Sequence, residues 1–473
     1  MESEKGLEEG QSKPAGRTRR RVLIGTAAVA GCAVLGGVLV LLPPDVWQSR
    51  PWSAPGPPER ARVAVGAGAP AARSALTVRI DEQEARVRAR PKDARAWAAL
   101  GTAYGERGRR TGVVADFPKA ERALQTSLKV RPTGNVEAYE GLAALALARG
   151  DFHTARRWGE EAVETAPQRW TAYPPLIDAH CGLGDMEAAD SSLNRLLALR
   201  SAPAVTAVAA RLYWEQGRSE DAAAAISEAA AHARSRAERA RYLVRAAELA
   251  WQRGERGKSL NYSTAALRAA PEDHAALAGQ ARALAALGRT ERAVRTYRSA
   301  LAKAQLPRYA LELGELHEAQ GRRDLARAQY EVLREAVREG TAARVNNSLL
   351  LGLFEADHGA PKEAVRLLRA EWKRHPSLRV ADALGWALHR TGQDREALGF
   401  AKQATEKRYR GEVRDALYAY HRGEIERALR RPGPARRQLA EALRVNPYFS
   451  PLHAPAAMRA LKELGEPSGK APK

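Results

Sequence analysis

The sequence predicts an all-α fold: a right-handed superhelical solenoid of about ten helix-turn-helix repeats, preceded by one transmembrane helix. A small residue returns about every 34 positions, a Gly usually lies five residues before it, and a Pro often lies twelve residues after it. A unit of this length cannot bury its own apolar stripe, so neighbouring units must stack and share one core. The ten small residues are Ala120, Ala155, Ala189, Ala222, Ser259, Ala293, Ala326, Ala364, Ala397 and Ala435.

The first predicted element is the apolar segment 22–42, which contains no charged residue and no Pro. At about 1.5 Å per residue, a helix of this length spans roughly 31 Å, the thickness of a hydrocarbon core. More basic residues precede the segment than follow it, so the positive-inside bias places residues 1–21 in the cytoplasm. We therefore expect a single-pass protein of the cell membrane, with a signal anchor and with its repeats outside the cytoplasm.

Three other interpretations of this segment stay open. The segment could be a cleaved signal peptide, although no small-x-small cleavage site follows it closely. Val29, Ala30, Gly31 and Cys32 resemble a lipobox, which would make Cys32 a lipid anchor. The neighbouring arginines of residues 18–24 form a weak twin-arginine export signal. Each of these alternatives also sends the protein to the cell envelope.

The rest of the chain divides by composition. Residues 43–72 are rich in Pro, Gly and Ala without apolar periodicity and predict an extended linker. Residues 73–450 carry the repeats, residues 451–465 predict a closing helix that shields the last repeat, and residues 466–473 predict a disordered tail.

The first complete repeat carries Trp97, Leu100, Gly101 and Tyr104 at W-x2-L-G-x2-Y spacing, followed by Ala120, Leu124 and Pro132. These residues resemble the tetratricopeptide repeat family, and the resemblance covers about residues 73–450. The family pattern implies that Gly in a first helix lets the second helix approach closely. An apolar residue four positions beyond the small residue then packs against the next repeat.

Two of the departures from the pattern concern the turns between helices. The first repeat inserts about seven residues between its helices, around residues 105–115, compared with the family spacing. The last repeat has no turn Gly and carries Arg430, Arg431, Pro432, Gly433 and Pro434 in its place.

The resemblance implies that first helices line a concave face that binds protein segments. Trp and Arg on such a face are typical of binding hot spots. Helical offsets within each repeat predict the following groove residues: Arg95, Glu137, Asp178, Arg211, Trp214, Arg241, Glu248, Trp251, Arg282, Arg308, Glu315, Asn346, Arg379, Asp382, Trp386, His389, Tyr420, Glu424 and Arg427.

No motif in the sequence predicts catalysis or a cofactor. Gly254 to Ser259 ends in Gly-Lys-Ser like a P-loop, but Gln252 stands where the first Gly is needed and a helix is predicted before the loop. The ten His residues lie singly, without metal-ligand spacing. We therefore expect no metal, no cofactor and no enzymatic activity.

The leading hypothesis is an anchored adaptor that binds a protein or peptide partner outside the cytoplasm. A second is a basic solenoid that binds an anionic envelope polymer, suggested by the net charge of +22 and by the basic segment 402–444. Nucleic acid is a weaker candidate because the repeats are expected outside the cytoplasm. An enzyme of unrecognised type is a third hypothesis. The sequence names neither the partner nor the oligomeric state.

Overall fold

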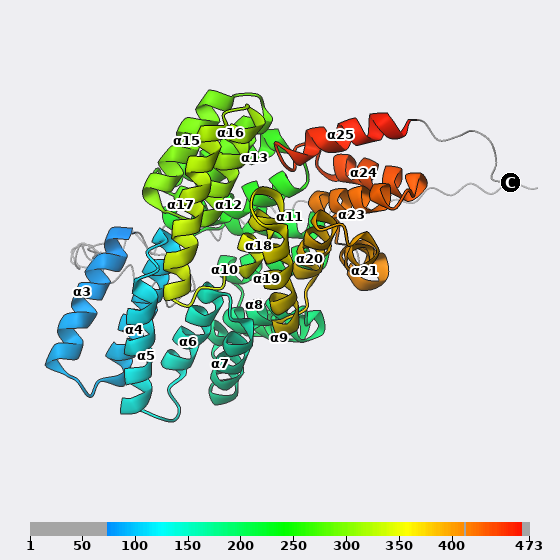
Figure 1. Ribbon diagram of the computed structural model, residues 1–473. Helices are drawn as coiled ribbons and strands as arrows, with labels where there is room; N and C mark the ends of the chain where they lie inside the picture. Colours follow the sequence, from blue (N-terminus) through cyan, green and yellow to red (C-terminus); the bar gives the residue numbers. More distant parts are fainter. Residues whose placement is uncertain (1–72, 411–412, 466–473) are drawn as a thin grey trace, which may run out of the picture. The chain divides into compact units, whose positions relative to one another are not determined.

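The computed structural model describes residues 73–410 and 413–465. The predictions for the anchor, the linker, Cys32 and the C-terminal tail lie outside these residues. All regular secondary structure in the described part is helical (Figure 1). No helix between residues 73 and 465, the gap at 411–412 aside, is long and apolar enough to cross a bilayer.

Ten helix pairs follow one another along the described residues, as the repeat count predicts. Helix α3 (Arg73–Ala89) precedes them, α25 (His453–Leu464) follows them, and η2 (Trp170–Ala172) and α22 (Lys407–Arg410) are short connecting elements. The pairs are α4 (Ala94–Thr111) with α5 (Asp116–Val130), α6 (Val136–Arg149) with α7 (Phe152–Thr165), α8 (Tyr173–Leu183) with α9 (Met186–Leu199), α10 (Pro203–Glu215) with α11 (Ser219–Ala231), α12 (Arg236–Gln252) with α13 (Arg256–Ala269), α14 (His274–Ala286) with α15 (Thr290–Lys303), α16 (Pro307–Ala319) with α17 (Arg323–Ala342), α18 (Ser348–His358) with α19 (Pro361–Arg374), α20 (Leu378–Arg390) with α21 (Asp394–Thr405), and α23 (Ala416–Ala428) with α24 (Pro432–Val445).

Small side chains hold the two helices of each pair together. All ten recurring small residues are at most 2% exposed, which confirms that they are packing residues. A Cβ added to Gly101 would lie 2.5 Å from Leu124 Cγ, and one added to Gly423 would lie 2.7 Å from Leu439 Cγ. Both distances are shorter than a van der Waals contact, so these first helices need Gly where the apolar residue of the second helix packs.

The turn between paired helices uses the left-handed backbone region. Gly150, Gly184, Gly217, Gly254, Gly288, Gly321 and Gly392 all have φ between 73° and 80°, whereas Gly359 has φ −134°. In the last repeat, Arg430 occupies this position with φ 56°. A non-Gly residue in this region is strained by crowding at its Cβ.

The insertion in the first repeat extends a helix rather than forming a loop. Helix α4 continues through Thr111, and the turn Gly is displaced to Gly112, with φ 72°. Our expectation of an insertion between the helices is therefore wrong. The extra turns of α4 carry Arg109 and Arg110, which become important below.

The turns between paired helices also contact segments a little under 200 residues later, or between five and six repeats along the solenoid. Gly112 packs against Leu306, Gly150 against Asn346, and Gly254 against Asn446. Hydrogen bonds join the same regions: the Asn346 amide donates to the Arg149 carbonyl (2.7 Å), and Asn446 Nδ2 donates to the Trp251 carbonyl (2.8 Å). We call this set of contacts the inter-turn seam.

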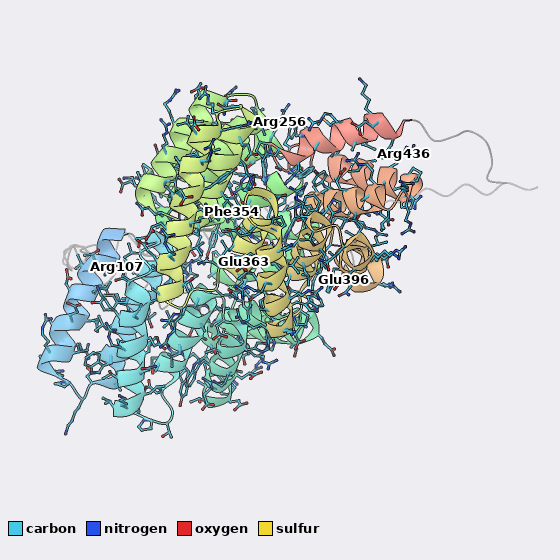
Figure 2. The ribbon with its side chains drawn as sticks, in the orientation of Figure 1. Arg107, Arg256, Phe354, Glu363, Glu396 and Arg436 are labelled. Carbon is cyan, nitrogen blue, oxygen red and sulfur yellow. The ribbon has the colours of Figure 1, made fainter. Side chains whose placement is uncertain are left out.

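The inter-turn seam satisfies backbone groups that every helix leaves unpaired. The last carbonyls of a helix have no partner within it, and here those of Arg110, Arg149 and Trp251 accept hydrogen bonds from the next superhelical turn. The guanidinium carbon of Arg256, which is labelled in Figure 2, lies 4.2 Å from the centroid of the Tyr448 ring and contributes a further contact. Successive turns of the solenoid therefore touch, and we call the space that its concave side faces the lumen.

The residues after α24 fold back onto the last repeats. His453 Nε2 of α25 lies 3.2 Å from Asp357 Oδ2 of α18, and Trp386 Nε1 donates to Asp357 Oδ1 at 2.9 Å. Burial acts to raise the pKa of Asp357, but the hydrogen bond and charge of His453 lower it to about 2. The closing helix is thus fastened by buried polar contacts as well as by apolar packing.

Weakening the inter-turn seam should destabilise the whole solenoid. Asn446→Asp keeps the Oδ1 acceptor for the Tyr448 amide but removes the donor to the Trp251 carbonyl. We expect the free energy of unfolding to fall by about 0.5–1.5 kcal/mol, because the Trp251 carbonyl loses one donor and keeps the Gly254 amide. Chemical denaturation measures it. Gln393→Glu, the same change at an exposed amide, serves as the control; equal stabilities for both variants would contradict the seam.

The strained turn of the last repeat predicts a stabilising substitution. Arg430→Gly should raise the free energy of unfolding by about 1 kcal/mol, since Gly adopts positive φ without Cβ crowding. Gly392→Ala, at the same position of the preceding repeat, should lower it. Thermal melts of the two variants beside the parent check both signs, and a destabilising Arg430→Gly would show that the turn is unstrained.

His358 predicts a pH-dependent contribution to stability. Its Nδ1 lies 3.1 Å from Glu318 Oε2 and its Nε2 3.6 Å from Glu315 Oε1, with the side chain 5% exposed. Burial disfavours the charged ring, but these two glutamates raise the pKa of His358 above its ordinary value. The resulting stabilisation is complete below the unfolded pKa of about 6.5 and is lost as the pH rises through the folded pKa.

The measurement is the free energy of unfolding of the parent and of His358→Gln between pH 5.5 and 9. The advantage of the parent should be greatest at low pH and should shrink as the pH rises. His232→Gln, at an exposed position, should show no such trend. An advantage that grows with pH would show that His358 is neutral in the folded state.

Candidate functional site

The lumen wall carries most of the predicted groove residues, and many of them are paired with one another. Asp178 Oδ2 and Arg211 Nη1 lie 2.6 Å apart, and Glu215 of α10 reaches Arg379 of α20 at 2.7 Å. The second pair joins helices 164 residues apart in sequence. The predicted Arg379 therefore meets Glu215, which was not predicted, from a distant repeat.

Arg282 of α14 is the most constrained charge of this surface. Its guanidinium bridges Glu248 of α12 and Glu312 of α16, each at 2.8 Å, and the Tyr297 hydroxyl donates to Glu312 at 2.9 Å. Burial acts to raise the pKa of Glu248, but the charge of Arg282 lowers it to about 2. The triad ties three successive first helices together and leaves none of its charges unpaired.

A cavity of about 630 Å³ opens beside this triad. The repeats contribute five predicted residues to its wall, namely Glu248, Trp251, Arg282, Arg308 and Glu315. The opposite wall comes from the C-terminal segment 447–458, with Tyr448, Phe449 and the half-exposed Met458. We had not predicted this second wall, because the segment was expected only to shield the last repeat. A mixed aromatic and charged cavity of this size fits one or two side chains of a partner.

Arg241 and Arg245 lie one helical turn apart on α12, and neither forms a hydrogen bond or an ion pair with any residue of the described part of the chain. Burial and the nearby Arg109 lower the pKa of Arg241, whereas burial and Arg211 lower that of Arg245. Arg241 was predicted as a groove residue and Arg245 was missed. The i, i+4 spacing was the signal that could have found it.

Three predicted groove residues are buried, so their assignment to an open surface is wrong. Trp386, Asp382 and Tyr420 are 3%, 2% and 5% exposed. The Trp386 ring stacks on His421 at 4.2 Å, and His421 Nδ1 bonds to Asp382 at 2.9 Å. The C-terminal segment helps to bury the two aromatic rings: His453 contacts both Trp386 and Tyr420, and Phe449 contacts Tyr420.

Other predicted residues serve structural contacts. Asn346 belongs to the inter-turn seam, and its side chain donates to Glu371 at 2.7 Å. His389 bonds to Asp394 at 2.5 Å, and Arg427 pairs with Glu424 and with Glu463 of α25. Trp214 is half-buried beside the apolar cluster of α10 to α13. The polar groups of Asn346, His389 and Arg427 are thus engaged within the chain, whereas Trp214 also lines a second pocket.

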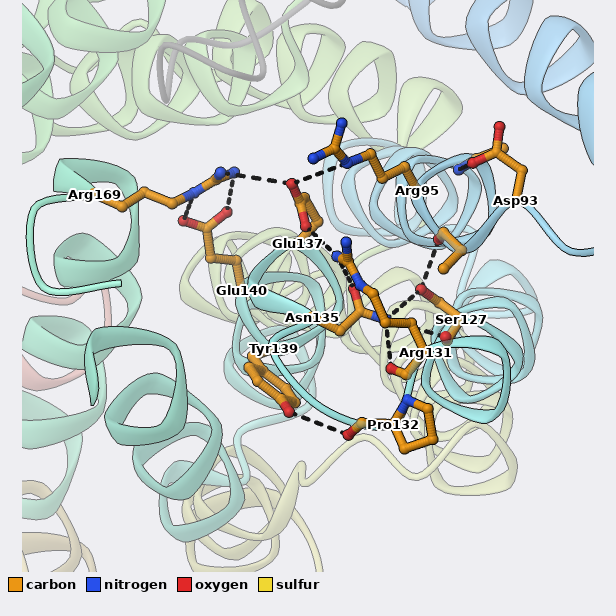
Figure 3. Close-up of polar contacts among 12 residues, drawn as sticks. Asp93, Arg95, Ser127, Arg131, Pro132, Asn135, Glu137, Tyr139, Glu140 and Arg169 are labelled. Atoms are coloured by element: carbon orange, nitrogen blue, oxygen red, sulfur yellow. Dashed lines mark hydrogen bonds and ion pairs between the residues drawn. The ribbon is translucent and has the colours of Figure 1, made fainter. Parts of the chain in front are cut away.

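The N-terminal rim of the concave face forms a polar network (Figure 3). Glu137 lies 3.9 Å from Arg95 and 2.7 Å from Arg131, and Arg169 pairs with Glu140 at 2.8 Å. Beneath it, Asn135 donates to Ser127, and Ser127 donates to the Ala94 carbonyl. The network links three consecutive repeats, so Arg95 and Glu137 act first as structural residues.

The P-loop-like string is structural. Gly254 is the turn Gly of its repeat, and Ser259 is 1% exposed as the small packing residue of α13. Lys258 pairs with Glu255 at 3.1 Å. A helix, α12, precedes the string, whereas a phosphate loop follows a strand.

Several solved structures are similar to the chain over part of its length. Among solved structures, the chain is similar to PilF of Pseudomonas aeruginosa, with 22% identity over 44% of this chain and 95% of that one and a TM-score of 0.35. It is also similar to a tetratricopeptide repeat protein of Parabacteroides merdae, with 16% identity over 55% and 98% of the two chains and a TM-score of 0.34. A chain of the APC/C hetero-tetramer Cut9–Hcn1 gives 14% identity, 87% and 86% coverage and a TM-score of 0.41.

No curated protein matches the sequence. A tetratricopeptide repeat family model matches residues 114–169, 244–310 and 279–341. These segments contain α5 to α7 and most of α12 to α17, including the wall of the 630 Å³ cavity that the repeats supply. For these segments, the match supports the family resemblance expected from the sequence.

Proposed function

We propose that this protein is a membrane-anchored tetratricopeptide repeat scaffold that binds a protein or peptide partner on its lumen-facing surface, outside the cytoplasm. The observation that carries the proposal is the cavity in which Trp251 and the charged triad of Arg282 face the C-terminal segment. Trp and Arg dominate binding hot spots because they combine a large contact area with directed polar contacts. In this cavity Trp251 and Arg282 both remain partly accessible.

The paired charges of the lumen favour binding over catalysis. Glu248 and Arg282 form an ion pair, so their charges stabilise the structure of this surface and are not available for proton transfer. Many basic residues of the segment 402–444 are likewise paired: Arg422 and Arg431 both lie near Glu426, and Arg444 pairs with Glu441. This pairing weakens the polymer hypothesis, because fewer cations remain to contact an anionic surface.

The membrane part of the proposal rests on the apolar length of residues 22–42 and on the basic residues before them. In this arrangement the linker 43–72 holds the repeats away from the bilayer. Partners would then be proteins of the envelope or of the extracellular space.

Crosslinking in native cells, followed by identification of the captured proteins, tests the proposal. Trp251→Ala should weaken capture by about 2 kcal/mol of binding free energy, or roughly thirtyfold, without a loss of helicity. Trp386→Ala is the matched control: it removes a buried indole, so it should lower the free energy of unfolding by about 3–5 kcal/mol instead. Equal capture by Trp251→Ala and the parent would show that the partner does not bind in this cavity. Capture of cytosolic proteins alone would contradict the placement of the repeats outside the cytoplasm.

A further inference from the structure

One stripe of α12 connects two different surfaces of the lumen. Arg241, Arg245, Glu248 and Trp251 follow one another at helical spacing along the same face. The Trp251 end of the stripe opens into the 630 Å³ cavity, which Tyr448 and Phe449 line from the other side. The Arg241 end contains the two arginines that have no partner.

Further arginines surround Arg241 and Arg245, and the acidic residues near them are already paired with other arginines. Arg109 and Arg110 of α4 repel the charge of Arg241. Arg211 of α10 and Arg379 of α20 repel the charge of Arg245. The acidic residues nearby are already engaged: Glu106 with Arg109 at 2.7 Å, Asp178 with Arg211, Glu215 with Arg379, and Glu248 with Arg282. Both unpaired guanidinium groups therefore lack the anion that would neutralise them.

Unpaired cations inside a folded protein cost stability, because burial removes water and like charges repel. Arg245 Nε is buried without a hydrogen-bond partner, while Arg241 remains open to the solvent of the lumen. Such a destabilising arrangement is typical of a binding site, where a ligand supplies the missing charge.

The geometry of the stripe sets the spacing that a ligand must have. At about 1.5 Å per residue, Trp251 lies roughly 9 Å along the helix from Arg245 and roughly 15 Å from Arg241. An extended chain advances about 3.3 Å per residue, so three to five residues bridge these distances. A polypeptide can present an apolar side chain and a carboxylate at this spacing, whereas a uniformly charged polymer has nothing to place in an aromatic cavity.

We propose that the partner segment is an extended acidic peptide that places one apolar side chain in the Trp251 cavity and a carboxylate, three to five residues away, between Arg241 and Arg245. This inference rests on the proposed function and specifies the chemistry of its partner. Arginine pairs with carboxylates through two parallel hydrogen bonds, so the site favours Asp or Glu over a neutral amide.

The test uses fluorescent peptides with one Leu in a Gly/Ser background and one Glu at two to six residues from it, each beside a matched Gln peptide. Fluorescence anisotropy with the full-length chain measures binding. The best Glu peptide should bind about tenfold more tightly than its Gln counterpart, and added salt should reduce the difference. Arg241→Gln with Arg245→Gln should abolish it. Arg239→Gln, at an exposed position of the same helix, should leave it unchanged.

A second measurement separates binding from structure. The apo double variant should melt at the same temperature as the parent or higher, because two unpaired cations are removed. A lower melting temperature would show that the arginines are structural and would overturn the inference. Equal binding of Glu and Gln peptides, or no binding at any spacing, would also overturn it. If Glu and Gln peptides bind equally but Trp251→Ala weakens the binding of both, the proposed function still stands. If no peptide binds at any spacing, the crosslinking experiment tests the proposed function separately.

Discussion

The contact between successive turns of the solenoid determines most of what this molecule can do. Helix ends normally leave carbonyl groups for water or caps, but here the ends of α6 and α12 give theirs to Asn346 and Asn446 of the next turn. A stack of repeats held only by nearest neighbours can bend and open. Contacts between repeats five to six positions apart add long-range restraints and hold the concave face, which lines the lumen, in one shape.

Enclosure changes the energetics of the charged residues on that wall. In an open groove, Arg282 and Glu248 would be a surface pair worth little. With the C-terminal segment on the other side, the same pair is partly desolvated, and its geometry matters more. The wall then has two zones: a cavity with satisfied charges around Trp251, and the unpaired guanidinium groups of Arg241 and Arg245. Selectivity for a partner can arise from using both zones at once.

The sequence was a good guide wherever the cause of the structure is local. Ala120, Ala397 and Gly101 could be assigned because one side chain and its partner helix decide whether a larger residue fits. The number of repeats follows from the same signal. The superhelical pitch does not, because it accumulates from small rotations between repeats that no single residue reveals. For this reason Asn346 was assigned to the groove, although it lies in the inter-turn seam.

The last repeats show the same limit. Trp386 and Tyr420 have the spacing of groove residues, and the return of residues 447–464 helps to bury them. Hydrogen exchange at the Asn346 backbone amide tests the contact between successive turns most directly, since its acceptor, the Arg149 carbonyl, belongs to the neighbouring turn. Touching turns predict slow exchange, comparable with that of amides inside the helices. Exchange at the rate of an exposed loop would contradict this contact.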